Sequence, residues 1–108
     1  MKSQVSKHYK KSRYKREKFI DNYLNEGHII DGFIVDKGHP MGVECHSITD
    51  NGIIIVHNIE SGKLVTKLIA RPQQIKRYYE FTGRETPPEY EHILEVARQH
   101  NIAGYNEL

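Results

Sequence analysis

Side chains that could perform acid–base chemistry are concentrated in the middle of the chain. Seven histidines occur among the 108 residues, and an imidazole titrates near neutral pH, so it can both accept and donate protons. A glutamate could act as a base, and a threonine hydroxyl could donate a hydrogen bond to developing negative charge. Four of the histidines stand alone on helices or at element ends and are set aside. The candidate catalytic residues are His39, Glu44, His46, His57 and Thr66.

Three cations in the same region could hold a phosphate group, namely Lys63, Lys67 and Arg71. With them, the set of groups matches the requirements of RNA cleavage without a metal ion. A base takes the proton of the 2′-hydroxyl, an acid protonates the leaving 5′-oxygen, and cations stabilise the pentacoordinate phosphate. We expect no cofactor. The tripeptide Glu44-Cys45-His46 could suggest zinc, but neighbouring strand residues point to opposite faces and the chain has no second cysteine, so no metal is expected.

The strand register decides whether these groups meet. If Asn51-Gly52 and Ser61-Gly62 form two-residue hairpin turns, His46 faces His57 and His57 faces Thr66 on one side of the sheet. Glu44 then lies two residues along on the same face. A three-residue turn over residues 50–52 is equally compatible with the sequence, and it would send His46 and His57 to opposite faces.

The N-terminal residues 1–18 form a basic arm. They contain eight lysines and arginines and one acid, whereas residues 19–108 contain eight bases and 13 acids. Tyr9 and Tyr14 are interleaved with the cations, so the arm could neutralise phosphates and stack on bases, or it could be a solvated end of a helix. The candidate nucleic-acid-binding residues of the arm are Lys7, Lys10, Lys11, Arg13, Lys15 and Arg16.

The elements that position these residues can be predicted from hydrophobic spacing. Helical spacing without Gly or Pro predicts a first helix over residues 6–26. Short β-branched segments between turn residues predict four strands, over residues 29–35, 43–49, 53–58 and 64–70. Two helices follow, over residues 73–81 and 89–100. The expected fold is α+β, a helix, a four-stranded antiparallel meander and two helices, with residues 19–108 forming a single domain.

The composition restricts the class of protein. Apolar residues make up 37% and charged residues 28% of the chain, which is enough for a modest core. A single cysteine excludes an intramolecular disulfide and favours a reducing, cytoplasmic location. The longest apolar run covers residues 53–56, so no membrane span and no signal peptide are expected. Motifs of nucleotide-driven enzymes and α/β hydrolases are also missing from the sequence.

Residues 36–79 resemble small phage and prophage proteins of Gram-positive bacteria. We associate these with the metal-independent endoribonuclease superfamily of barnase, EndoU, cytotoxic colicins and RelE-type toxins. The motifs that carry the resemblance are Gly38-His39-Pro40, Glu44-x-His46, Asp50-Asn51-Gly52, Leu64-Val65-Thr66-Lys67 and Ala70-Arg-Pro-Gln-Gln-Ile-Lys-Arg-Tyr78. The resemblance implies a helix before a four-stranded sheet, catalytic roles for His39, His46 and Thr66, and phosphate contacts from Lys67 and Arg71. Glu44, the base in barnase-like members, stands in a different local context here, and His57 comes from the register alone.

The sequence is therefore compatible with three functions. The first is an endoribonuclease that cuts RNA by internal transesterification, with RNA as substrate and an inhibitor or immunity protein as a candidate partner. The second is a non-catalytic module that binds nucleic acid or a protein through the same sheet and arm. The third is a structural interaction protein, suggested by Tyr78, Tyr79, Tyr90 and Tyr105, because exposed tyrosines are common at protein interfaces.

Overall fold

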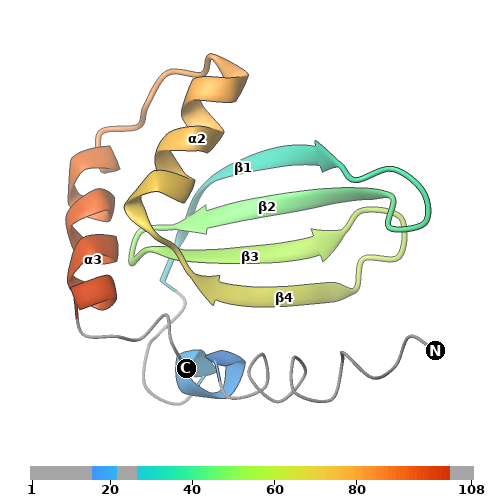
Figure 1. The fold of residues 1–108 in the computed structure, drawn as a ribbon, viewed down its shortest axis with the longest axis horizontal. Helices are drawn as coiled ribbons and strands as arrows, with labels where there is room; N and C mark the ends of the chain where they lie inside the picture. Colours follow the sequence, from blue (N-terminus) through green and yellow to red (C-terminus); the bar gives the residue numbers. More distant parts are fainter. Residues whose placement is uncertain (1–15, 22–26, 103–108) are drawn as a thin grey trace.

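The computed structural model describes residues 16–21 and 27–102. Residues 16–21 are helical, and the rest of the predicted first helix lies outside the described residues. The elements that follow are β1 (Ile29–Asp36), β2 (Val43–Thr49), β3 (Ile53–Asn58), β4 (Leu64–Ile69), α2 (Pro72–Thr82) and α3 (Tyr90–Ile102). Their order confirms the predicted α+β fold, with a four-stranded antiparallel sheet followed by two helices (Figure 1).

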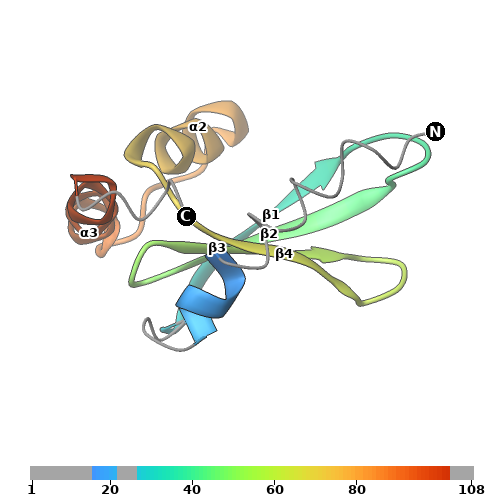
Figure 2. The ribbon, with the colours of Figure 1, turned by 60° about the horizontal axis from the view of Figure 1, so that its bottom comes forward.

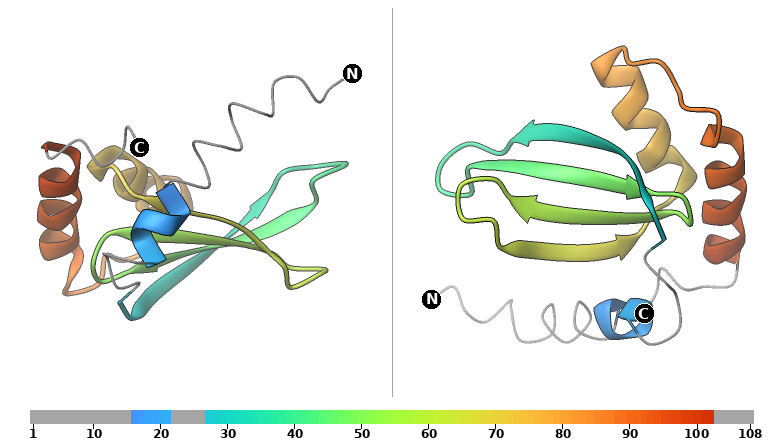
Figure 3. Two further views of the ribbon diagram at one scale, coloured as in Figure 1. Left: turned by 90° about the horizontal axis from the view of Figure 1, so that it is seen from below. Right: turned by 180° about the vertical axis from the view of Figure 1, so that it is seen from behind.

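The sheet has the order β1-β2-β3-β4, so each strand pairs with its neighbour in sequence and β1 and β4 form the two edges. Helices cover both faces. The helical segment 16–21 packs on one face, and α2 and α3 pack on the other (Figures 2 and 3). We call these the N-terminal face and the α2 face.

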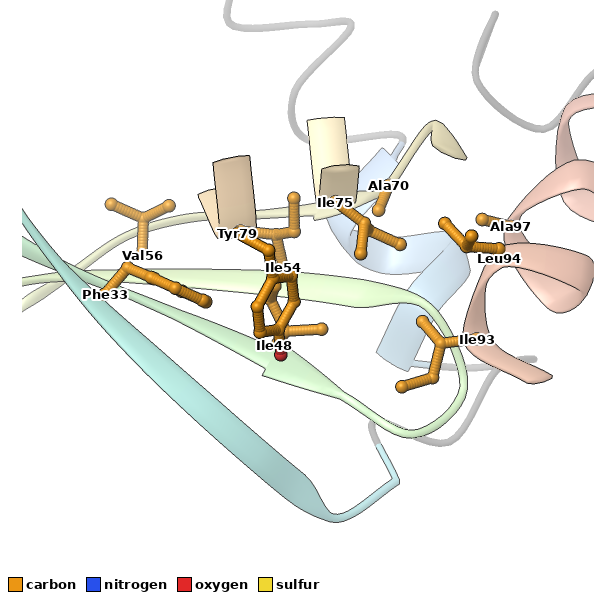
Figure 4. Packing of buried hydrophobic residues seen from close by; sticks show 10 residues of the cluster. All are labelled: Phe33, Ile48, Ile54, Val56, Ala70, Ile75, Tyr79, Ile93, Leu94 and Ala97. Carbon is orange, nitrogen blue, oxygen red and sulfur yellow. The ribbon is translucent and has the colours of Figure 1, made fainter. Parts of the chain in front are cut away.

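Each face has its own hydrophobic cluster. On the α2 face, Phe33, Ile48 and Ile54 from the strands pack against Ile75 of α2 and Leu94 of α3 (Figure 4). On the N-terminal face, Ile20 packs on the centre of β3 and on the end of β4. Consecutive residues of β3 thus enter different cores, which explains why this strand has an uninterrupted run of four buried apolar side chains.

The register between β2 and β3 differs from the one that two-residue turns predict. His46 pairs with Val56, and His57 pairs with Cys45, so the two histidines lie on opposite faces of the sheet. The connection is the three-residue alternative, with Gly52 at a positive φ of 80°. The buried Thr49 hydroxyl favours this turn, because it donates to Asn51 Oδ1 at 2.6 Å and accepts from the Ile53 N–H at 3.0 Å.

The expected pairing of His57 with Thr66 is also wrong. Thr66 pairs with Val56, and His57 pairs with Leu64 across an irregularity in the ladder. The β3–β4 turn is longer than two residues. The Asn58 N–H donates to the Lys63 carbonyl, and the Asn58 carbonyl accepts from the Gly62 N–H, so residues 59–62 form the loop. A longer loop combined with a bulge moves Thr66 away from the register position expected for it.

Helix α2 connects the two edges of the sheet. It begins directly after β4, with Pro72 in its first turn, and it ends at Gly83, whose φ of 64° gives a left-handed cap. The C-terminal half of α2 packs on β1, since Tyr78 and Tyr79 both contact Phe33. None of the helices in the described part of the chain combines the length and apolar character needed to cross a bilayer.

Candidate functional site

His46 is held in a three-residue network on the α2 face. Its Nε2 lies 2.9 Å from Glu44 Oε1, and its Nδ1 lies 2.6 Å from the Tyr78 hydroxyl. Glu44 is buried and His46 is largely buried. A neutral imidazole with its proton on Nε2 donates to Glu44 and accepts from Tyr78, so one tautomer satisfies all three side chains. We call Glu44, His46 and Tyr78 the His46 network.

The environment of Tyr78 keeps its hydroxyl protonated. Burial and, to a smaller extent, the nearby Glu44 carboxylate raise the pKa of Tyr78 to about 12. The hydroxyl therefore remains a proton donor throughout the neutral range. Its role in the network is to orient His46 and to fix the Tyr78 ring, which stacks on Phe33 with a centroid distance of 5.1 Å.

The raised pKa predicts a loss of stability at alkaline pH. Tyr78 ionises near pH 10 in the unfolded chain and near 12 in the folded protein, so the protonated form stabilises the fold and this contribution is lost between these values. We expect the free energy of unfolding, measured in urea at a series of pH values, to fall more steeply over this interval in the wild type than in Tyr78→Phe. Equal slopes in the two proteins would contradict the assignment.

A second polar cluster lies beside the first, on the other side of Phe33. The Tyr79 hydroxyl donates to Asp31 Oδ2 at 3.0 Å, and Arg84 pairs with Asp31 and binds the Gly32 carbonyl. The Arg84 guanidinium also lies 4.6 Å from the centre of the Phe33 ring, close enough for a cation–π contact. Phe33 therefore connects two hydrogen-bonded clusters that fasten the end of α2 to β1.

The structure does not bring the other candidate catalytic residues to the His46 network. His57 faces the N-terminal side of the sheet. His39 is exposed in the loop between β1 and β2. Thr66 lies on the β4 edge and donates its hydroxyl to Glu17. Among the described residues, Glu44 and His46 are thus the only members of the predicted catalytic set joined by a hydrogen bond, and they lie beneath α2.

The three predicted phosphate ligands are distributed along β4, one before the strand, one within it and one after it. Lys63 precedes the strand and Arg71 follows it, and a strand of six residues spans about 20 Å. Lys67 lies between them, with its ammonium 2.8 Å from Asp21. Lys7, Lys10, Lys11, Arg13 and Lys15 lie outside the described residues, whereas Arg16 is described and half-buried.

A carboxylate and a hydroxyl meet on the outer edge of β4. Glu17 Oε2 accepts from the Thr66 hydroxyl at 2.8 Å and from the Lys67 N–H at 3.2 Å. The helical segment 16–21 thus lies against this edge, where it also supplies Asp21 to Lys67. Sequence reasoning did not identify Glu17, because it is the one acid in a basic stretch and its partners are about 50 residues away.

Arg16 and Arg71 lie together in a hollow of about 180 Å³, which we call the β4–α2 pocket. Leu68 and Ile69 form its apolar wall, and Gln74 contributes from the first turn of α2. Gln74 Oε1 caps the backbone by accepting from the Arg71 N–H at 2.8 Å. Within the described part of the chain, neither guanidinium has a hydrogen-bonded or ion-paired partner. Two cations next to a helix N-terminus favour an anionic ligand.

The described tyrosines that were proposed as interface residues contact other side chains within the protein instead. Tyr79 is only 4% exposed, and its ring packs edge-on against Phe33 and Tyr90. Tyr78 and Tyr90 are half-buried, and Tyr105 lies outside the described residues. The adjacent residues Tyr78 and Tyr79 do not indicate an exposed interface. The Tyr78 hydroxyl is hydrogen-bonded to His46, and the Tyr79 hydroxyl is hydrogen-bonded to Asp31.

Comparison with protein families, with curated proteins and with solved structures found no match. The site therefore has to be interpreted from its own geometry. Among residues 16–21 and 27–102, no group of three or more His, Cys, Asp or Glu side chains is arranged to hold a metal ion. The chemistry that the described residues offer is a buried hydrogen-bonded histidine on the α2 face and a cationic pocket at the junction of β4 and α2.

Proposed function

We propose that this protein is a nucleic-acid-binding module that holds the phosphate backbone of RNA in the β4–α2 pocket. The observation that carries the proposal is the pairing of Arg16 with Arg71 around one hollow, with both guanidinium groups unpartnered among the described residues. Arginine presents several donors in a planar fork that matches the oxygens of a phosphate group. The single free cysteine supports a reducing compartment, where RNA is the abundant polyanion.

The charge of the chain supports the same ligand. Arg16 belongs to the basic segment of residues 1–18, which contains eight lysines and arginines and one acid, so the pocket shares a residue with the most basic part of the sequence. The rest of the chain carries a net charge of −5, which would repel a polyanion elsewhere. The pocket therefore contains a cation from the basic segment of a chain that is otherwise acidic.

Binding is favoured over cleavage by the positions of the histidines. General acid–base catalysis requires its groups within hydrogen-bonding reach of the scissile phosphate. His46 is largely buried and engaged at both ring nitrogens, and His57 lies on the opposite face. A ligand in the β4–α2 pocket would contact arginine and glutamine side chains, which bind phosphate without transferring protons.

The test is binding of a labelled RNA to the full chain at several salt concentrations. We expect the affinity to fall steeply with salt, and Arg16→Gln and Arg71→Gln each to lower the slope of log K against log salt by about 0.7, the value for one lost phosphate contact on a single strand. The control is Arg98→Gln on α3, whose guanidinium already pairs with Glu95. Equal slopes for all three variants would overturn the proposal.

Cleavage of RNA is the second candidate function, and one observation supports it. Glu17 directly follows the pocket residue Arg16, and Thr66, which donates its hydroxyl to Glu17, lies two residues before the pocket residue Leu68. Glu17 could accept the 2′-hydroxyl proton while the arginines stabilise the phosphate. If the protein cuts RNA in the presence of EDTA, we expect Glu17→Gln to slow the reaction by about 100-fold or more and to leave binding intact. Intact RNA after prolonged incubation would exclude this function.

A further inference from the structure

A larger groove lies next to the β4–α2 pocket, between α2 and the free edge of β1. Its volume is about 700 Å³. The wall from the sheet includes Phe33 and Lys37, and the wall from α2 includes Gln74, Arg77, Tyr78 and Phe81. We call it the β1–α2 groove. None of the functions proposed above uses it.

The groove and the pocket adjoin each other along α2. Gln74 lines both of them. Gln74, Tyr78 and Phe81 follow one another at intervals of three or four residues, which places them on one stripe of α2, and Arg71 is the N-cap residue directly before the helix. From Arg71 to Phe81 the path extends about 15 Å at 1.5 Å per residue, the length of about four nucleotides at a stacked spacing of 3.4 Å. A strand bound at Arg71 can therefore reach Phe81.

The charges along this path are complementary to a polyanion. Among the described residues that line the two hollows, four carry a positive charge and Asp36 alone carries a negative one. The cations are Arg16, Lys37, Arg71 and Arg77. An acidic peptide would also satisfy these charges, but the aromatic side chains in the groove distinguish the two ligands.

Phe81 is the feature that identifies the ligand. Its side chain is 86% exposed at the C-terminal end of α2, where it lines the β1–α2 groove. Tyr78 lies one turn earlier, and its ring is fixed by Phe33 and by the hydroxyl contact to His46. A basic groove with an exposed aromatic ring is the arrangement that binds single-stranded nucleic acids, because every base offers a flat face for stacking.

We propose that single-stranded RNA runs from the β4–α2 pocket along α2 into the β1–α2 groove, where an unpaired base stacks on Phe81. This inference rests on the proposed RNA binding and adds the class of RNA. A duplex keeps its bases stacked within the helix and offers no base face to Phe81, whereas loops and single strands do. The protein therefore selects unpaired RNA.

The experiment measures the affinity of the full chain for a labelled RNA of about ten nucleotides, within the range of single-strand site sizes, and for the same sequence as a duplex. We expect tighter binding of the single strand, a loss of about tenfold in Phe81→Ala, which corresponds to about 1.4 kcal/mol of stacking, and recovery in Phe81→Trp. Ile102→Ala is the matched control, because it removes an 81% exposed apolar side chain at the end of α3.

The outcomes separate this inference from the proposal on which it rests. No RNA binding by the wild type overturns both. If Arg71→Gln weakens binding but Phe81→Ala does not, the pocket binds RNA and the path along α2 is wrong. If Phe81→Ala weakens binding of single strand and duplex equally, the groove does not select unpaired bases. If the single strand competes poorly with an acidic peptide for the same groove, the groove serves a protein partner and the inference fails.

Discussion

Replacing Phe33 by alanine should lower the free energy of unfolding by about 3–5 kcal/mol, the usual cost of removing a buried aromatic ring. The ring is 2% exposed and contacts Tyr78, Tyr79 and the Arg84 guanidinium. Its removal leaves a cavity and also frees the C-terminal half of α2 from β1. Urea or guanidinium denaturation measures the change, because the midpoint falls if stability is lost.

Ile34→Ala provides the matched control for Phe33→Ala. Ile34 is the next residue of β1, but its side chain is 65% exposed on the other face of the sheet. We expect a change within about 0.5 kcal/mol, as for other surface positions. Similar losses in the two variants would mean that Phe33 does not connect α2 to the sheet as the contacts indicate.

The second large effect is expected for His46→Ala, which should destabilise the protein by about 3 kcal/mol, within the range for a buried charged hydrogen bond that loses one partner. The truncation leaves the buried Glu44 carboxyl and the Tyr78 hydroxyl without the imidazole that joins them. The same denaturation measurement detects the loss. Addition of RNA should not change the difference between variant and wild type, because His46 is not in the β4–α2 pocket.

His57→Ala is the control for His46→Ala, because His57 is half-buried on the opposite face. We expect it to cost less than half as much stability. The pair also distinguishes a structural from a catalytic histidine. If His46→Ala retained its stability and abolished cleavage of RNA by about 100-fold or more, His46 would be an acid–base group, and the assignment of a structural network would be wrong.

The elements of the fold could be predicted because each carries a local signal. The β-branched residues of β1 and β3, Pro72 at the start of α2 and Gly83 at its end specify their structure within a few residues of sequence. The structure confirms the strands and the helix predicted for these segments. Local signals were sufficient because the type of each of these elements does not depend on a distant part of the chain.

The register could not be predicted, because the pattern that normally fixes it is missing from β3. A strand with one buried face alternates between apolar and polar residues, and a slip of one residue exposes its apolar side chains. β3 is covered on both faces, so residues 53–56 are all apolar and either register buries them. The turn decides instead, through the Thr49 hydroxyl and through Asp50, which accepts from the His28 N–H across to the start of β1.

The candidate site was only partly predictable for a related reason. Arg71 and the basic arm could be proposed as phosphate-binding elements from charge alone. The contribution of Gln74, Glu17 and Phe81 depends on how α2 and the helical segment 16–21 lie on the sheet. Contacts between residues about 50 positions apart produce no periodic pattern in a sequence, so the roles of these residues could be seen only in the structure.

The hydrogen bonds at the two outer strands also affect how the protein behaves at high concentration. Unpaired backbone groups on an edge strand are a template on which another chain can add a strand, which leads to aggregation. Glu17 occupies the Lys67 N–H on β4, and Arg84 and Asp31 occupy the backbone of Gly32 on β1. Charged side chains thus occupy backbone groups on both edge strands. Because these groups are no longer free to pair with another chain, they disfavour the addition of strands that would lead to fibrils.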